Sequence, residues 1–441
     1  MKCRRGRLTD RESSERGNDM EALEKIAGGG LDGLLTALYG AERLAEQKER
    51  FAKAEKAFSE LYGARQGLRV FSAPGRTEIG GNHTDHNHGR VLAGSVDLDV
   101  IAVVAFNDSG IVRIKSEGYP MDTVEISDLS PREEEKNKAI SLIRGTLARF
   151  AALGYKIGGF DAYTTSNVLK GSGLSSSAAF EVLVGTILSG GYNDGAVDPV
   201  EIAKIAQYAE NEYFGKPCGL MDQMASSVGN IITIDFADPA KPVIERVDFD
   251  FAQSGYALCI VDTGGNHADL TGEYAAIPAE MKAVARDMGC EFLRQTSLEA
   301  VFGRIAALRQ AHGDRAVLRA IHFLKDNERV AKQVAALRRG DFDAFQALVI
   351  ESGRSSFCYL QNVYACCNVQ EQGLSLALCM AEELLSGKGA WRVHGGGFGG
   401  TTQNFVPAGE LARFKTAMEQ VFGEGSCHVL RIRPYGGIEI K

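Results

Sequence analysis

The sequence predicts an α+β protein built in two lobes, and three observations support this fold class. Segments typical of strands and of amphipathic helices are mixed along the chain, without the regular strand–helix–strand alternation of a parallel α/β sheet. The chain has 441 residues, which is long enough for more than one hydrophobic core. Its 44% hydrophobic and 24% charged residues are ordinary for a globular protein.

The first half of the chain supplies its expected elements in the following order. Residues 1–20 are polar and without periodicity, which predicts a disordered segment, and Met20 offers an alternative start. Residues 31–62 repeat apolar side chains at helical spacing and predict one or two amphipathic helices. LRVFSAP predicts a strand that Pro74 ends. Further strands are expected at 96–108, 111–117 and 159–168, with a glycine-closed helix at 141–159.

The second half is expected to be richer in helices. One apolar helix follows the serine-rich segment near residue 176, and another covers 200–215. Strands at 231–236 and 256–263 come next, and 273–387 predicts mostly long amphipathic helices. The chain closes with a strand, glycine loop and strand at 390–407, a helix at 410–423 and a strand at 428–436.

Charge and cysteine usage exclude several classes of protein. With a net charge of −8, the chain lacks the excess of basic residues that is typical of a nucleic-acid binder. No run of about eighteen apolar residues marks a membrane span, and no apolar segment follows the basic start to make a secretory signal. The nine cysteines are scattered without a CxxC pair, which is typical of reduced thiols, so we expect a cytoplasmic protein.

The segment GSGLSSSAA, residues 171–179, runs directly into an apolar helix. Backbone N–H groups and the dipole at a helix start form an anion site, and serine hydroxyls there can bind phosphate or the shell of a magnesium ion. The segment lacks the Gly-Lys-Ser/Thr of a Walker loop. A serine-rich cap on a buried helix is the alternative, and both interpretations stay open.

HGGGFGG, residues 394–400, contains the glycine spacing of the dinucleotide fingerprint. A strand follows it where the fingerprint needs a helix, and too few residues remain for a dinucleotide domain. The glycines therefore predict a turn between two strands. Such a turn is either purely structural or lets the backbone approach a ligand closely.

Two carboxylates stand out further along the chain. Asp222 lies among apolar and small residues, where it is either a general base or the cap of the next helix. Glu210, twelve residues earlier and beside Glu212, would by itself indicate a solvated surface pair.

The loop GRTEIGGNHTDHNHG, residues 75–89, holds three of the eight histidines. His83, Asp85, His86 and His88 are metal-ligand types, but alternation would place 83 and 85 on one face and 86 and 88 on the other. An imidazole and a carboxylate on one face suit a small polar substrate, so we favour a substrate loop over a zinc site or a plain polar turn.

Four segments together resemble the galactokinases, which belong to the GHMP group of small-molecule kinases. GRTEIGGNHTDHNHG is similar to the galactokinase signature, and KGSGLSSSAAFEV to the phosphate loop of the group. PCGLMDQ resembles the segment with the catalytic aspartate, and HGGGFGGT the third glycine motif. Weaker likeness extends the resemblance from about residue 66 to the end of the chain.

The resemblance implies a two-lobed GHMP kinase fold with the active site between the lobes. We expect an N-terminal extension at 1–65, an N-terminal lobe for sugar and ATP at 66–245, and a C-terminal lobe at 246–441. Such a kinase moves the γ-phosphoryl group of ATP to the anomeric hydroxyl of galactose, with magnesium. Sugar and ATP are the expected partners of a monomer or weak homo-oligomer.

The resemblance also assigns roles by position. Asp222 matches the catalytic base and Arg76 the arginine beside it. The magnesium ligands match Ser176, Ser177 and Glu210. The ATP loop matches Gly171, Ser172, Gly173, Leu174, Ser175, Ser176, Ser177 and Ala178. The sugar contacts match Asn82, His83, Asp85, Gly219 and Tyr274.

Asn82 departs from the family pattern, which usually has a glutamate there that contacts the exocyclic hydroxyl of the sugar. An amide grips that hydroxyl more weakly and does not repel a carboxylate, so we expect tolerance of changes at the exocyclic carbon. Kinases for galacturonate, arabinose or heptose sugars are alternatives. A non-catalytic sugar and ATP sensor is another, which the intact serine loop with Glu210 and Asp222 disfavours.

Overall fold

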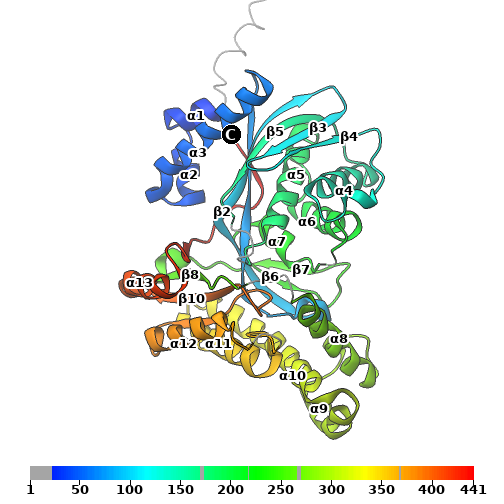
Figure 1. Ribbon diagram of the computed structural model, residues 1–441, viewed down its shortest axis with the longest axis vertical. Coiled ribbons are helices and arrows are strands. Elements are labelled where there is room, and N and C mark those ends of the chain that lie inside the picture. The colour runs from blue at the N-terminus through cyan, green and yellow to red at the C-terminus, as the bar shows by residue number, and fades with distance from the viewer. Residues whose placement is uncertain (1–21, 169–172, 217, 266–269, 367–368) are drawn as a thin grey trace, which may run out of the picture.

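The computed structural model describes residues 22–168, 173–216, 218–265, 270–366 and 369–441. Two sheets, each covered by helices, lie one above the other (Figure 1), which confirms the α+β prediction. The segment expected to be disordered, 1–20, lies outside the described residues, as do Gly171 and Ser172 of the expected ATP loop. No helix within the described ranges is long and apolar enough to cross a membrane.

The first sheet has eight strands and is antiparallel except between β3 and β5. Its main path runs β12-β1-β2-β5-β3-β4, and β6 and β7 extend it beside β2. The bounds are β1 Arg69–Gly80, β2 Arg90–Asn107, β3 Ile111–Ser116, β4 Met121–Glu125, β5 Gly159–Ser166, β6 Ile231–Asp235, β7 Val243–Arg246 and β12 Ile438–Ile440.

Strand β1 does not end at Pro74, and that prediction was wrong. The pairing with β2 shifts register between Pro74 and Arg76, which is the irregularity where a residue without an N–H is tolerated. In addition β12 pairs only with residues 70–72, so β1 has a neighbour on one side at Pro74. The strand therefore continues to Gly80 and carries Arg76 and Glu78 into the middle of the molecule.

Helices cover both faces of the first sheet (Figure 1). Alternate residues of the strands point to opposite faces: Val70, Ile101 and Val103 belong to one buried cluster and Phe71, Ala102 and Val104 to the other. The first cluster includes α1 Ala22–Gly28, α2 Asp32–Tyr39 and α3 Leu44–Tyr62, so residues 31–62 form two helices as expected. On the opposite face lie α4 Ala139–Ala152, α5 Ser176–Tyr192, α6 Pro199–Tyr208 and α7 Met221–Val228.

The second sheet is antiparallel with the order β11-β8-β10-β9. Its strands are β8 Tyr256–Asp262, β9 Ala390–Val393, β10 Thr401–Pro407 and β11 Cys427–Leu430. The strand–glycine loop–strand unit and the helix-rich segment are confirmed. The main helices are α8 Thr271–Asp287, α9 Leu298–Gly303, α10 Ile305–Arg338, α11 Phe342–Ser355, α12 Gly373–Leu385 and α13 Leu411–Phe422.

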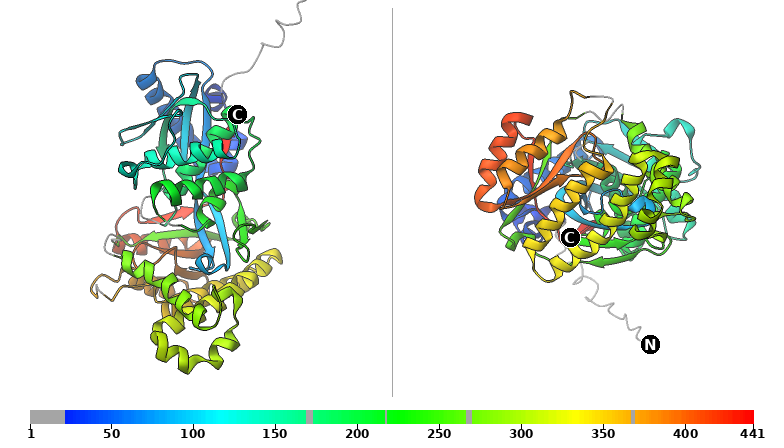
Figure 2. Two further views of the ribbon diagram at one scale, coloured as in Figure 1. Left: turned by 90° about the vertical axis from the view of Figure 1, so that its right-hand side faces the viewer. Right: turned by 90° about the horizontal axis from the view of Figure 1, so that it is seen from below.

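The two parts are tied together by long strands and by the chain end. Figure 2 shows β1 and β2 running from the first sheet down to the helices of the second part. The last strand, β12, returns to the first sheet although it lies beyond residue 245. The division of the chain at 65 and 245 stays a proposal.

Candidate active site

The serine loop is the segment at residues 171–177, and its described part, from Gly173, leads into α5. Ser175 occupies the N-cap position with a left-handed φ of 58°, but its side chain caps no backbone group of the helix. Its hydroxyl instead donates to Oδ2 of Asp222. The serine-cap alternative is therefore not realised at Ser175. Ser175 thus leaves the first N–H groups of this 17-residue helix uncapped, and such groups attract anions.

Asp222 lies in the first turn of α7 and faces the serine loop. It does not cap this helix, whose N-cap is Leu220 without a side-chain bond. Arg76 Nε donates to Asp222 Oδ1 at 2.7 Å, and Arg76 Nη1 donates to the carbonyl of Gly173. Burial raises the pKa of Asp222, but the Arg76 charge and the Ser175 hydrogen bond outweigh it and hold that pKa below its usual value. Asp222 is therefore an ionised carboxylate, and 34% of its side chain is exposed.

Glu210 is buried, whereas its neighbour Glu212 is exposed, so the two do not form a solvated pair. The reason is local: α6 continues into η4, a π-helical turn at Ala209–Phe214, and this turn directs Glu210 inward. Its Oε1 lies 3.5 Å from Ser177 Oγ and from Lys216 Nζ, and its Oε2 accepts a 2.7 Å hydrogen bond from Gln223 Nε2.

Glu181 is a residue that the sequence reasoning missed. It is fully buried on α5, accepts a 3.3 Å hydrogen bond from Gln223, and its Oε1 has no partner among the described residues. Burial, reinforced by the charge of Glu210, raises the pKa of Glu181 well above its usual value. A lone carboxylate inside the apolar run AAFEVLV was the available signal.

These groups fit a magnesium ion. The Glu210 carboxylate and the Ser177 hydroxyl are hard oxygen donors, which magnesium prefers, and the orphaned Oε1 of Glu181 belongs to the same hydrogen-bonded group. Across the described parts of the chain no three His, Cys, Asp or Glu side chains are grouped as a metal site, and the histidines of residues 83–88 belong to none.

The histidine loop, residues 81–89, is not an extended segment, because Asp85–Asn87 forms a 3-10 turn. The expected alternation of faces was therefore wrong: the rings of His83 and His86 lie 6.2 Å apart, and His88 stacks on Phe292 at 3.6 Å. His83 Nε2 lies 2.9 Å from the carbonyl of Gly396, and burial lowers the pKa of His83 to about 4. This imidazole is neutral near pH 7, so Nε2 carries the proton donated to that carbonyl.

Asp85 lies against Gly219, which comes from the segment before α7. A Cβ added at position 219 would overlap Oδ2 of Asp85, so glycine is the residue that permits this approach. Two residues with expected sugar roles, far apart in the sequence, are in contact here.

Asn82 is fully buried, and its amide is saturated by protein groups. Nδ2 donates to Glu78 Oε1 at 3.0 Å and to the carbonyl of Gly395 at 2.7 Å. Oδ1 accepts from Ser356 at 3.1 Å and from Asn362 at 2.8 Å. Direct contact between Asn82 and a sugar stays a prediction that this arrangement does not favour, because no donor or acceptor of the amide remains free.

The glycine turn of the β9–β10 hairpin docks on β1 and on α8. His394 Nε2 lies 3.1 Å from Thr77 Oγ1 and accepts the backbone N–H of Glu78 at 3.3 Å. Tyr274 donates its hydroxyl to the carbonyl of Gly397 at 2.7 Å, and burial raises the pKa of Tyr274 to about 12. The glycines permit this close approach, because a Cβ added at Gly396 would overlap the ring of Tyr274 and one added at Gly397 would overlap Asn362.

The structure brings the described residues of the expected site into two linked groups. The first joins β1, the serine loop, η4 and α7 and consists of Arg76, Gly173, Leu174, Ser175, Ser177, Glu210 and Asp222. The second joins the histidine loop to Gly219, the glycine turn and Tyr274. Ser176 and Ala178 lie in the first turn of α5.

Comparison with known proteins gives the class. The galactokinase galactose-binding signature matches residues 56–106, and the family model of the GHMP kinases N terminal domain matches 141–230. The fold matches the crystal structure of Lactococcus lactis galactokinase complexed with galactose, with a TM-score of 0.74 and 24% identity over 87% of this chain and 98% of that chain. Fold and site therefore define a GHMP-type small-molecule kinase.

Curated relatives narrow the assignment. A Streptomyces coelicolor galactokinase is 32% identical over 382 residues, which are 85% of this chain and 94% of that protein. Human galactokinase is 31% identical over 397 residues, which are 87% of this chain and 95% of that protein. The chain belongs to the galactokinase family.

Proposed function

We propose that the protein transfers the γ-phosphoryl group of ATP to the anomeric hydroxyl of galactose. The observation that carries this proposal is the Arg76–Asp222–Ser175 group at the start of α5, which joins an ionised carboxylate to the serine loop. Phosphoryl transfer needs in-line positioning and neutralised phosphate charge more than covalent chemistry, and this group supplies positioning.

The triphosphate would lie against residues 171–178. The first-turn N–H groups of α5 and the helix dipole attract its negative charge. Arg76 supports this arrangement, because its guanidinium bonds the carbonyl of Gly173 while it pairs with Asp222. ATP binding and acceptor activation are thereby held in one geometry.

Asp222 would accept the proton of the anomeric hydroxyl as the hydroxyl attacks. Its lowered pKa keeps it ionised at neutral pH, so the base form is always present. Arg76 keeps the carboxylate ionised and adds positive charge beside the developing negative charge of the transition state.

Magnesium would be held by Ser176, Ser177 and Glu210, with Gln223 orienting the glutamate. When bound, the ion supplies charge neutralisation for the phosphates. The sugar would be held by His83, Asp85, Gly219 and Tyr274, with Asn82 behind them.

The family relationship favours galactose over galacturonate, arabinose or heptose sugars, and a kinase over a non-catalytic sensor. We also propose a reducing, cytoplasmic setting, which the free thiols of all seven described cysteines support. A monomeric or weakly homo-oligomeric state stays a prediction.

ADP release over a panel of sugars tests the proposal. We expect magnesium-dependent turnover with galactose, and lower kcat/KM with arabinose, galacturonate and a heptose. Binding of galactose and ATP without ADP release would show a sensor, and a higher kcat/KM for another sugar would replace galactose as the substrate.

A further inference from the structure

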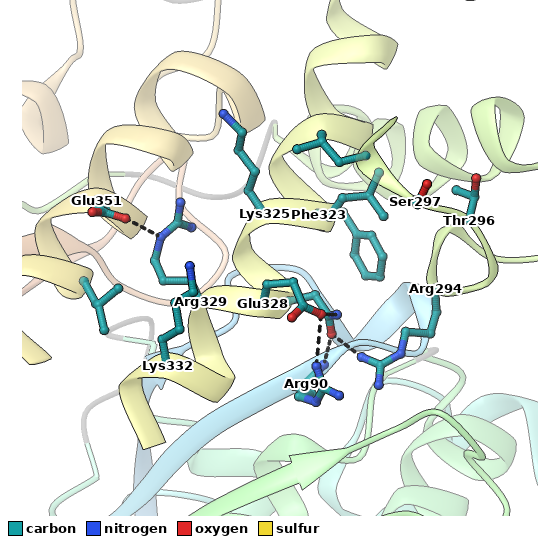
Figure 3. Close-up of a pocket in the computed structure, with 14 residues that line it drawn as sticks. Arg90, Arg294, Thr296, Ser297, Phe323, Lys325, Glu328, Arg329, Lys332 and Glu351 are labelled. Atoms are coloured by element: carbon teal, nitrogen blue, oxygen red, sulfur yellow. Dashed lines mark hydrogen bonds and ion pairs between the residues drawn. The ribbon is translucent and has the colours of Figure 1, made fainter. Parts of the chain in front are cut away.

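A cavity of about 640 Å³ is lined by Arg90, which directly follows the histidine loop, and shares no residue with the site described above. It opens between the start of β2, residues 294–298, α10 and α11 (Figure 3). Five cationic side chains line it: Arg90, Arg294, Lys325, Arg329 and Lys332. The volume is that of a small-molecule site, which is typically about 300–1,000 Å³.

The three arginines are held in place by carboxylates. Arg90 Nε and Arg294 Nη2 each lie 2.9 Å from Asp235 Oδ2. Arg329 pairs with Asp326, a buried residue that also accepts the backbone N–H of Asn82 at 2.9 Å. A guanidinium has five N–H donors, so each arginine keeps donors free for a ligand in a fixed position.

The two lysines carry charge that protein carboxylates do not neutralise. Within the described chain neither Lys325 nor Lys332 has a carboxylate within 4.0 Å, and Lys325 lies over the ring of Tyr359 at 5.4 Å. The two carboxylates that line the cavity, Glu328 and Glu351, are largely exposed and pair with Arg90 at 3.3 Å and with Arg329 at 3.5 Å (Figure 3). The arginines are therefore neutralised, and the two lysines leave positive charge at the cavity that an anion can neutralise.

We propose that this cavity binds a small phosphate-bearing anion. Guanidinium forks match phosphate oxygens, and ammonium groups add point charge to a dianion. The hydroxyl of Thr296 on the cavity wall offers a further donor to phosphate or to a polar body attached to it. A long polyanion is excluded by the cavity volume and by the net charge of −8.

Calorimetric titration tests the proposal, with the nucleotide and sugar sites first saturated by magnesium, a non-hydrolysable ATP analogue and galactose. We expect inorganic phosphate to bind with one additional equivalent, and Lys325→Ala/Lys332→Ala to raise its Kd by about 10-fold or more. Lys53→Ala/Lys56→Ala on α3 removes two exposed lysines elsewhere, so this control should keep the wild-type Kd. Galactose 1-phosphate in place of phosphate distinguishes the sources: tighter binding identifies a phosphorylated sugar, and equal or weaker binding identifies free phosphate.

Absence of the additional equivalent in the wild type, or an unchanged Kd in the cavity variant, would overturn the site. The titration of the ATP analogue alone reports separately on the proposed kinase function. Both lysines lie on the surface of α10, where alanine is a good helix former, so the variant is expected to fold, and its melting temperature checks this.

Discussion

Replacement of Asp222 by asparagine separates the chemical role of this residue from its structural one. The carboxylate accepts hydrogen bonds from Arg76 Nε and from the Ser175 hydroxyl. An asparagine can keep the first bond with its carbonyl oxygen and donate its amide to the serine, because a hydroxyl also accepts. The geometry of the serine loop is therefore expected to survive, while the charge and the proton acceptor are lost.

The size of the effect follows from this separation. Loss of a positioned general base costs about 10²–10⁴-fold in rate, or about 3–5.5 kcal/mol of barrier. The nucleotide does not depend on that base, so its Kd should change less than about 3-fold, within one weak hydrogen bond. Asp222→Asn should thus lower kcat for galactose by at least about 100-fold while ATP binding is retained.

The assay measures ADP release for kcat and calorimetry for nucleotide binding. Ser175→Ala removes one neutral partner and keeps the base, so it should cost about 10-fold or less. Asp287→Asn is a matched control, because Asp287 pairs with Arg304 and His312 outside the site and its variant should retain wild-type turnover. If Asp222→Asn turns over galactose within about 3-fold of the wild type, the general-base assignment is wrong.

Three further predictions follow from the same geometry. Chelation should abolish turnover, and magnesium but not zinc should restore it; recovery with zinc alone would contradict the oxygen-donor site. Gly219→Ala should raise the KM for galactose about 10–100-fold, because the new Cβ displaces Asp85, and should leave the KM for ATP unchanged. A galactose KM equal to that of the wild type would show that Gly219 and Asp85 do not bind the sugar together. Between pH 6.5 and 4 the unfolded chain protonates His83 but the folded protein does not, so stability should fall by up to about 3 kcal/mol on acidification through that window. Urea unfolding should show a smaller loss in His83→Gln and the wild-type loss in His86→Gln, and identical curves for all three proteins would contradict the buried neutral imidazole.

The sequence predicted the fold class, most of the elements, the turn formed by the glycine segment and the helix that follows the serine segment. Those predictions rest on local signals, such as alternation, helical period and the small residues that turns require. Predictions that depended on long-range context were less accurate. Pro74 continues a strand because β12 leaves one side free there, and this pairing joins residues at opposite ends of the chain.

The burial of Glu210 shows a second kind of limit. Its neighbours in sequence are those of an exposed helix end, and a one-residue widening of that helix into a π turn directs the side chain inward. Gln223 then connects Glu210 to Glu181, so three side chains from three helices form one buried group. No spacing rule along the sequence links these three positions.

At Asn82 the same limit affects the prediction of sugar specificity, because the partners of its amide are distant in sequence. Position alone suggested an amide facing the exocyclic carbon of the sugar, yet all four hydrogen bonds of the amide go to protein groups. One partner is Glu78, a buried carboxylate that pairs with Arg392 at 2.7 Å and whose pKa burial raises.

A glutamate at position 82 would therefore meet a second carboxylate in a buried setting, and either a proton must be bound or the network must open. The same amide holds the carbonyl of Gly395, next to the Gly396 carbonyl that accepts from His83. Any effect of this departure from the family pattern on sugar choice is thus expected to act through the position of the glycine turn and of His83. For that reason Asn82→Glu should change the KM for galactose and for its 6-deoxy analogue together, whereas a larger change for galactose alone would show that residue 82 reaches the exocyclic hydroxyl directly.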